Sequence, residues 1–170
     1  DYPFEKIDSL LKTGDLSVIN LESPLLKNCQ TTLEGMSFCG TAGFAAAMKR
    51  HGVGLATLEN NHIGNQGIQG ITETKNLLAE QGIPFARYDE SFITTIKGVK
   101  FAFLPVNGVG SALDRTLLAS RISSLRPKVD VLIVCVHWGK EYTYDPVSAP
   151  GIAPDDPQEI AHLMIDSGAD

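Results

Sequence analysis

Short apolar runs alternate along this chain with segments of helical periodicity, and this alternation constrains the fold more than any other feature. The apolar runs are too short for helices and end in glycine, proline or polar residues, as buried strands do. The segments between them carry apolar residues three and four positions apart, which is typical of helices packed on a sheet. Strands are predicted over 16–24, 53–59, 83–88 and 129–139. Helices are predicted over 3–14, 41–52, 68–82, 111–125 and 156–168.

One segment departs from the alternation. Residues 91–106 hold two β-rich runs joined at "KG", which is typical of a β-hairpin. The sequence therefore predicts an α/β fold with a mixed sheet. The run "VDVLIVCVHWG" is the most apolar strand, and we expect it to be buried on both faces. Residues 25–40 are predicted to form a loop.

Three of the predicted helices have recognisable faces or ends. The face of the first consists of Phe4, Ile7, Leu10 and Leu11, with Gly14 as its C-terminal cap. The face of the helix over 68–82 consists of Ile68, Ile71, Leu77 and Leu78. The last helix is expected to begin with Asp156 as its N-cap and Pro157 in its first turn.

Length and composition indicate one domain with a hydrophobic core. The chain has 170 residues, of which 43% are hydrophobic and 20% charged. Its net charge of -6 disfavours nucleic acid as a partner, because phosphate binding needs a basic face. No apolar run approaches the ~20 residues needed to span a bilayer. Because the chain begins at Asp1 and stops at "IDSGAD", where a helix leads toward a new strand, we expect residues 1–170 to be a single domain truncated at both ends.

The cysteines leave two alternatives open. Cys29 and Cys39 flank a polar segment, and they are either a disulfide formed in an oxidising compartment or two unpaired thiols. Cys135 lies within an apolar run and is interpreted as a small buried hydrophobic residue.

Polar side chains follow three of the predicted strands. In open α/β sheets, ligands bind beyond the carboxyl ends of the strands. If the three strands are adjacent and parallel, their ends converge on one crevice. The side chains concerned are Asn20 and Glu22 after the first strand, Asn60, Asn61 and His62 after the second, and His137, Trp138, Glu141 and Tyr142 after the third.

These side chains offer a mixed oxygen and nitrogen ligand set. A carboxylate, a carboxamide and an imidazole suit a divalent ion such as Mn, Fe or Zn. A second histidine beside the ion can donate a proton to a leaving group. Each residue also has a structural alternative: Glu22 as a solvated loop carboxylate, Asn60 and Asn61 as a helix cap or turn, His62 as an exposed loop residue, and His137 as a half-buried, satisfied histidine.

Several motifs resemble one known family. "INLESP", "ENNHIGNQGIQGITETKNLLAEQGIPF" and "VHWGKEYTYDP…PQEIAHLMIDSGAD" are similar, in order and spacing, to segments of the bacterial capsule-synthesis CapA family. These poly-γ-glutamate biosynthesis proteins resemble calcineurin-like metallophosphoesterases. The resemblance covers essentially the whole chain. It implies a mixed-sheet sandwich flanked by helices, here an incomplete domain, with a metal site at the strand ends.

The resemblance also implies roles for individual residues. Glu22, Asn61 and His137 match metal ligands, and His62 matches the acid that protonates the leaving oxygen. Asn20, Asn60, Trp138, Glu141 and Tyr142 are then expected to line the crevice. Gly67 and Gly70 match a tight lead into the next helix.

Two departures from the family pattern weaken this expectation. The family usually has aspartate three residues after the histidine of "NNH", where this chain has Asn65. The family's early Gly-Asp motif and its late Gly-His-x-His motif fall outside the sequence, so we expect only part of a metal site.

Two functions from different classes remain open. The first is a metal-dependent, phosphoesterase-type hydrolase of capsule or poly-γ-glutamate biosynthesis. The second is an accessory protein without catalysis that binds an anionic envelope polymer and assists its synthesis, export or anchoring. The partners expected are an anionic polymer or a phosphoester substrate and membrane subunits of a polymer synthase. The family implies a location at the bacterial cell envelope, on its extracellular face. A plain α/β domain whose strand-end polar groups only cap helices is the third alternative.

Overall fold

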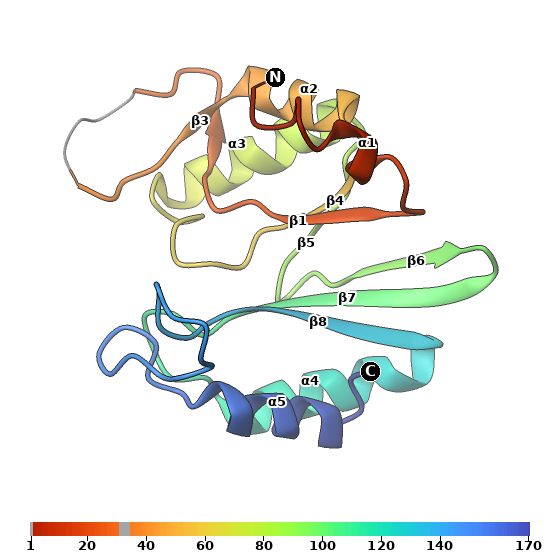
Figure 1. The fold of residues 1–170 in the computed structure, drawn as a ribbon, viewed down its shortest axis with the longest axis vertical. Coiled ribbons are helices and arrows are strands. Elements are labelled where there is room, and N and C mark those ends of the chain that lie inside the picture. The colour runs from red at the N-terminus through yellow and green to blue at the C-terminus, as the bar shows by residue number, and fades with distance from the viewer. Residues whose placement is uncertain (1, 31–34) are drawn as a thin grey trace. The chain divides into compact units, whose positions relative to one another are not determined.

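The computed structural model describes residues 2–30 and 35–170. The chain divides into two compact units. The N-terminal unit comprises Asp1–Leu58 and His62–Phe85, and the C-terminal unit comprises Glu59–Asn61 and Ala86–Asp170 (Figure 1). The single domain expected over residues 1–170 stays a prediction.

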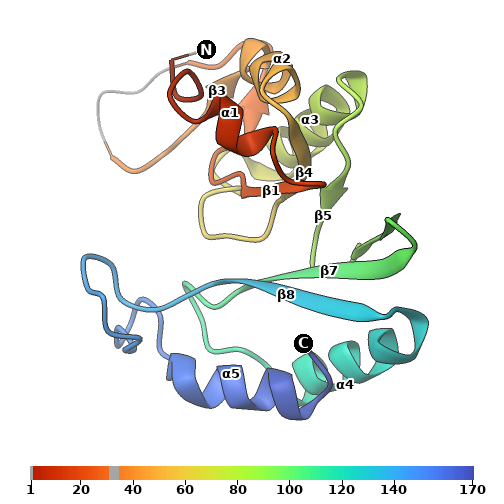
Figure 2. The ribbon, with the colours of Figure 1, turned by 45° about the vertical axis from the view of Figure 1, so that its right-hand side comes forward.

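A small sheet and two helices form the N-terminal unit. The sheet has the order β1-β4-β5, with β1 (Ser17–Asn20) and β4 (Val53–Thr57) parallel and β5 (Phe85–Ala86) on the other side of β4. Helices α2 (Ala42–Arg50) and α3 (Gly67–Glu80) lie on the same side of this sheet (Figures 1 and 2). Their buried side chains, among them Met48 and Leu78, pack with Val53 and Ala56 of β4 into one core.

Two further short elements complete this unit. Helix α1 spans Asp8–Leu11, and strands β2 (Leu25–Leu26) and β3 (Gly40–Thr41) form a parallel pair. The side chain of Thr74, fully buried on α3, accepts a hydrogen bond from the main-chain N–H of Leu25 at 2.8 Å and donates one to the carbonyl of Gly70 at 2.7 Å. This hydroxyl therefore joins α3 to β2.

The C-terminal unit is a three-stranded mixed sheet covered on one side by helices. Strands β6 (Phe92–Ile96) and β7 (Val99–Asn107) are antiparallel, and β8 (Val131–His137) runs parallel to β7. Helices α4 (Arg115–Leu125) and α5 (Pro157–Asp166) lie together along one side of β7 and β8, with a 3₁₀ turn, η1 (Arg126–Lys128), after α4 (Figure 1). The core between them includes Leu104, Leu132, Ile122 and Ile160.

Local chemistry explains where the elements of this unit begin and turn. Lys97 and Gly98 both have positive φ, 49° and 87°, which is the backbone of a two-residue hairpin turn of type I′. Asp114 caps α4 by accepting from the N–H of Leu117, and Asp156 caps α5 by accepting from Gln158 and Glu159. The hairpin, both helices and the Asp156 cap were predicted, and the mixed α/β fold class is confirmed.

The first predicted helix is wrong for most of its length. Only Asp8–Leu11 is helical, and residues 2–7 form turns. Ile7 and Leu10 are 41% and 70% exposed, whereas Phe4 is buried and stacks on the His51 ring. Helical periodicity does not apply to a segment of turns, so Phe4 reaches the core without Ile7 or Leu10. The helix also ends at Leu11, before Gly14.

Ile68 is not on the buried face of α3, where it was predicted. Its side chain is 83% exposed. The buried face consists of Gly70, Thr74, Leu77 and Leu78. At about 100° per residue, a position two before Gly70 lies on the opposite side of the helix. The buried face begins at Gly70 and continues four residues later at Thr74. Neither residue is a large apolar one, so the apolar pattern alone did not reveal this face.

Two strand predictions also need correction. Strand β8 lies at an edge of the order β6-β7-β8, and Ile133 in its centre is 36% exposed while Leu132 is fully buried. The expectation that this strand is buried on both faces is therefore wrong, since its own helices cover one face only. The predicted loop over 25–40 begins with the short strand β2 and ends at the first residue of β3, and its residues 31–34 lie outside the described part of the chain.

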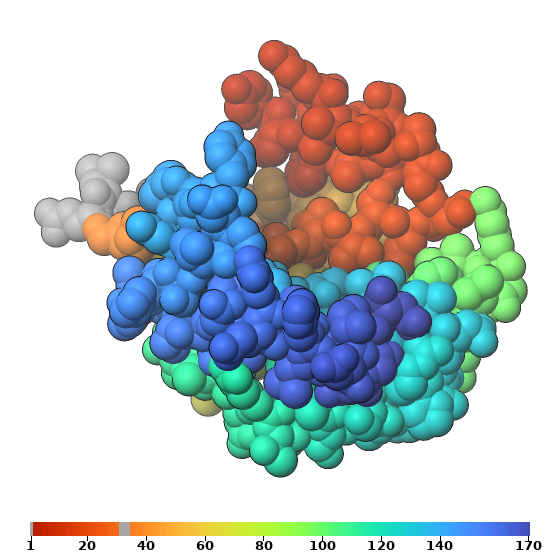
Figure 3. All heavy atoms as spheres, turned by 60° about the horizontal axis from the view of Figure 1, so that its bottom comes forward, coloured from red at the N-terminus to blue at the C-terminus, as the bar shows by residue number. Residues whose placement is uncertain are grey.

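The surface of the C-terminal unit includes a long loop between β8 and α5, coloured mid-blue in Figure 3. Tyr142 and Tyr144 in this loop are fully exposed. Within residues 2–30 and 35–170, no helix is long and apolar enough to cross a membrane.

Candidate active site

The carboxamide of Asn61 and the imidazole of His137 face each other within the C-terminal unit. His137 ends β8, and Asn61 lies in the turn that follows β4. Asn61 Oδ1 and His137 Nε2 are 2.9 Å apart. Residues 76 positions apart in sequence are thus brought to hydrogen-bonding distance at a strand end. Both were predicted as metal ligands.

The spacing of these two atoms fits two neighbouring ligands of one ion. Protein oxygen and nitrogen atoms lie about 2.1 Å from zinc and similar divalent ions. Two such ligands are ~3.0 Å apart around an octahedral ion, close to the separation of this pair, and ~3.4 Å apart around tetrahedral zinc. Across residues 2–30 and 35–170, no group of three or more His, Cys, Asp or Glu side chains gathers where it could hold a metal. By the separation of its two atoms, the pair of Asn61 and His137 fits part of a metal site.

The end of β8 is held firmly by its neighbour β7. Asn107 of β7 is in register with His137, and the main-chain N–H of Gly108 donates to the carbonyl of His137 at 2.8 Å. The next residue, Trp138, packs against the core beneath the sheet. These contacts fix the backbone that carries the His137 imidazole. They also give Trp138 a packing role besides its predicted place in the crevice.

His62 belongs to the N-terminal unit and is 8% exposed. Its Nδ1 lies 3.1 Å from Oδ1 of Asn65, and its ring centroid lies 4.3 Å from that of Phe38. A turn places Asn65 beside His62, and the Asn65 N–H donates to the carbonyl of His62 at 2.9 Å. The alternative of an exposed loop histidine is therefore wrong. Asn65, which departs from the family pattern, is a direct partner of the imidazole.

Asn20 and Glu22 lie at the end of β1, beside the end of β4. Asn20 is in register with Thr57, and the N–H of Leu21 donates to the carbonyl of Thr57 at 3.0 Å. Glu22 is half-buried and Asn20 is exposed, whereas Asn60 is only 5% exposed. The predicted adjacency of these two parallel strand ends is confirmed.

The third strand end belongs to a different sheet. Strand β8 pairs with β7, in the order β6-β7-β8, while β1 and β4 pair with each other in another sheet. The expectation that all three strands are adjacent is therefore wrong. The parallel neighbour of β8 is β7, the second strand of the hairpin. The alternation of strands and helices did not specify this pairing. Glu141 and Tyr142 lie in the exposed loop after β8, and their role in a crevice stays a prediction.

Sequence analysis missed a pocket at the end of β7. Glu59 Oε2 accepts from the N–H of Tyr88 at 3.0 Å and from Nε of Arg87 at 3.4 Å. Burial raises the pKa of the Tyr88 hydroxyl above its ordinary range. Glu59 and Tyr88 line a pocket of roughly 190 Å³ whose walls also include Asn107, Leu113 and Asp114. Two features of the sequence could have indicated this pocket: Glu59, the first residue of "ENNH", and Asn107, which ends the apolar run of β7.

These observations define the class of protein: a mixed α/β chain with polar residues at its strand ends. The model of the family described as "Bacterial capsule synthesis protein PGA_cap" matches residues 1–170, and the chain belongs to this family. It is 26% identical to the capsule biosynthesis protein CapA of Bacillus anthracis, covering 100% of this chain and 46% of that protein. It is 23% identical to the PGA biosynthesis protein CapA of Bacillus subtilis (strain 168), covering 100% of this chain and 49% of that protein. The chain thus spans about half the length of the curated relatives it matches.

A solved structure supports the fold class. The chain resembles the crystal structure of a Staphylococcus aureus protein assigned as a 5'-nucleotidase, in complex with alpha-ketoglutarate, with a TM-score of 0.50 and 14% identity. The match covers 75% of this chain and 29% of that one. The predicted metallophosphoesterase-type fold and the predicted family are confirmed. Membership of a capsule-synthesis family associates the protein with the cell envelope.

Proposed function

We propose that this protein contributes a metal-dependent, phosphoesterase-type hydrolase site to capsule or poly-γ-glutamate biosynthesis. The observation that carries the proposal is the 2.9 Å approach of Asn61 Oδ1 to His137 Nε2. Both atoms are ordinary ligands for Mn, Fe or Zn, and both come from residues that the family resemblance places at a metal. The phosphoesterase-like fold supports the same assignment.

In this proposal Asn61 and His137 hold the ion, with Glu22 as a carboxylate ligand. When bound, a divalent ion lowers the pKa of a coordinated water and polarises the phosphoryl oxygen. His62 has the role of proton donor to the leaving oxygen. Its burial to 8% exposure and its bond to Asn65 support that role, because both restrict the orientation of the imidazole. We assign Asn20, Asn60, Trp138, Glu141 and Tyr142 to the lining of the crevice.

The proposal extends to partners and location. The substrate class is a phosphoester or an anionic polymer, and the intact protein is proposed to act with membrane subunits of a polymer synthase. We place it on the extracellular face of the envelope. Two observations support an oxidising, extracellular location: the Cys29–Cys39 disulfide and the membership of a capsule-synthesis family.

A second candidate is a non-catalytic accessory protein that binds an anionic polymer. The described residues gather no cluster of three acidic, histidine or cysteine ligands, and Asn65 is neutral where the family usually has a carboxylate. Both observations favour this alternative. A polymer binder tolerates loss of His62, whereas a hydrolase that uses it as an acid does not.

The experiment that separates the two candidates uses the full-length gene product loaded with Mn²⁺, Fe²⁺ or Zn²⁺. Metal content and hydrolysis of a generic phosphodiester are measured for wild type, His62→Ala and His137→Ala, with His162→Ala as a matched control on the exposed side of α5. The hydrolase predicts bound metal, loss of metal in His137→Ala, and a fall in kcat of about 10²-fold or more in His62→Ala with metal retained. Wild-type protein without bound metal or hydrolysis refutes it and leaves the accessory role.

A further inference from the structure

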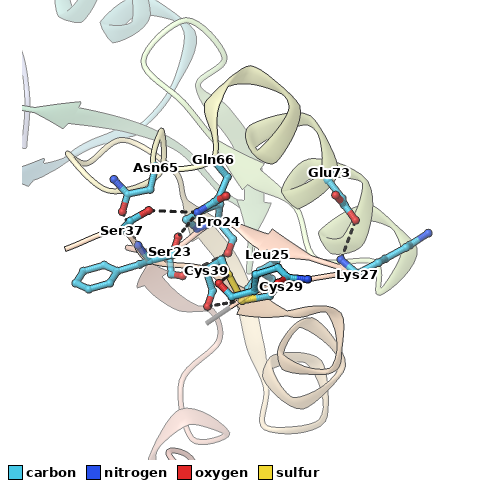
Figure 4. Close-up of a disulfide and its surroundings, with 12 residues drawn as sticks. Ser23, Pro24, Leu25, Lys27, Cys29, Ser37, Cys39, Asn65, Gln66 and Glu73 are labelled. Carbon is cyan, nitrogen blue, oxygen red and sulfur yellow. Dashed lines mark hydrogen bonds between the residues drawn. A yellow bond between two sulfur atoms is a disulfide. The ribbon is translucent and has the colours of Figure 1, made fainter. Parts of the chain in front are cut away.

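A disulfide lies next to the residues that hold His62. Cys29 and Cys39 form the bond, and Phe38 immediately precedes Cys39. Figure 4 shows Asn65 and Gln66 turned toward Ser37 and the segment that leads into Cys39. The Gln66 side chain donates to Ser37 Oγ at 3.3 Å and to the carbonyl of Phe38 at 3.4 Å. The segment before Cys39 is thus attached to the turn that carries His62.

The carboxamide of Asn65 has one possible orientation. Its Oδ1 accepts the main-chain N–H of Phe38 at 2.8 Å, and a main-chain N–H is only a donor. Turning the amide over would place its NH₂ group against that N–H, so the oxygen must face Phe38. The same oxygen lies 3.1 Å from Nδ1 of His62.

The orientation of Asn65 determines the tautomer of His62. An amide oxygen cannot donate a hydrogen bond, so Nδ1 of the neutral imidazole must carry the proton. Nε2 is then the nitrogen that accepts a proton and delivers it. The Phe38 ring, 4.3 Å away and tilted by 37°, packs on the imidazole and limits its rotation. One residue, Phe38, therefore restrains His62 both directly and through Asn65.

We propose that the Cys29–Cys39 disulfide is a positioning element for His62. The bond holds Phe38 where its N–H orients Asn65 and its ring packs on the imidazole, so that His62 is kept as the Nδ1–H tautomer with Nε2 as its reactive nitrogen. The use of Nε2 in proton transfer rests on the proposed function. The fixed tautomer rests only on the contacts within the N-terminal unit.

The test measures the tautomer directly by long-range ¹H–¹⁵N NMR of the histidine rings in the full-length protein. A Cys135→Ser background removes the remaining thiol, which lies in the C-terminal unit. In the oxidised protein, at a pH where His62 is neutral, we expect the Nδ1 shift of a protonated nitrogen and the Nε2 shift of an unprotonated one. Reduction with dithiothreitol, or the pair Cys29→Ser and Cys39→Ser, should move the tautomer ratio about fivefold, the effect of losing roughly one hydrogen bond. An unchanged His62 spectrum overturns the inference.

His51 serves as an internal control for folding, because its Nδ1 contacts Asp8 at 2.6 Å in the same unit. If the cysteine variants change the His51 signals as well, the same NMR measurement is made on Asn65 variants of the protein with its disulfide intact. Asn65→Leu, which removes the acceptor, should lose the fixed tautomer, and Asn65→Asp, which keeps an acceptor, should retain it. A Leu variant with the wild-type tautomer contradicts the inference.

Kinetics then separate this inference from the proposed function. If the protein hydrolyses the phosphodiester, reduction should lower kcat about fivefold and leave KM unchanged, because a misplaced proton donor affects the chemical step. If it does not hydrolyse, the NMR result still decides whether the disulfide positions His62. Loss of the tautomer on reduction supports the inference in either case.

Discussion

The buried hydroxyl of Thr74 provides a sharp test of what holds the disulfide-bearing segment to its helix. Thr74→Val keeps the shape of the side chain and removes its oxygen. The N–H of Leu25, a fully buried residue, then loses its partner at 2.8 Å. A buried donor without a partner costs about 1–3 kcal/mol. The carbonyl of Gly70 also loses the hydroxyl that donates to it at 2.7 Å, so we expect a loss of about 2 kcal/mol in the free energy of unfolding.

The matched variant Thr74→Ser keeps the hydroxyl and removes only the methyl group. Deleting one buried methyl group costs about 0.5–1.5 kcal/mol, as in Ile→Val substitutions. Urea unfolding followed by far-UV circular dichroism, with the slope m compared between variants, gives both values. The valine variant should be the less stable by about 1 kcal/mol, and its Tm should fall by ~4–8 °C below wild type. A serine variant that is as unstable as the valine variant would show that packing, and not the bond to Leu25, joins α3 to β2.

Three further predictions concern other parts of the chain. Asp156→Ala should lower the free energy of unfolding by about 1 kcal/mol in urea titrations, because the N–H groups of Gln158 and Glu159 lose their acceptor, and Asp156→Asn should cost far less. Replacing Cys29 and Cys39 by serine should cost up to about 3 kcal/mol, because the disulfide closes a short loop in the unfolded chain and lowers its entropy; an equal free energy of unfolding for the variant and the oxidised wild type would contradict this. Hydrogen bonds from Lys12 and then His51 hold the pKa of Asp8 below its ordinary value of 3.8, so its stabilising contribution is present above pH 3.8 and is lost as the pH falls through the lowered pKa. Asp8→Asn should therefore flatten the acid limb of the stability curve, and an identical limb in thermal melts between pH 2 and 5 would exclude this role.

The sequence predicted the residue types of the candidate site more fully than it predicted how those residues are arranged. Asn61 and His137 were expected together, and they lie 2.9 Å apart. Asn61 and His62 are consecutive in sequence and were expected to serve one centre. In the structure, Asn61 groups with the C-terminal unit, while His62 packs against Phe38 and Asn65 in the N-terminal unit. Sequence spacing could show which strand ends carry polar side chains, but the partners of each side chain depend on chain segments far away.

The amino-acid sequence by itself determined the features that depend on a few neighbouring residues. Apolar periodicity predicted α2, α3, α4 and α5, and the "KG" pair predicted the turn between β6 and β7. Asp156 predicted the start of α5 because a cap acts on N–H groups two and three residues away. These signals operate within one turn of the chain, so no distant contact was needed to interpret them.

Only the tertiary structure decided which elements are neighbours. Strand β8 pairs with β7, one face of β8 is covered by α4 and α5, and Ile68 is exposed on α3. The disulfide between Cys29 and Cys39 and the contact of Phe38 with His62 likewise join residues that no local pattern connects. The physical reason is that strand order and loop closure follow from how whole elements bury their apolar faces against one another, and a pattern of single residues leaves several such packings open.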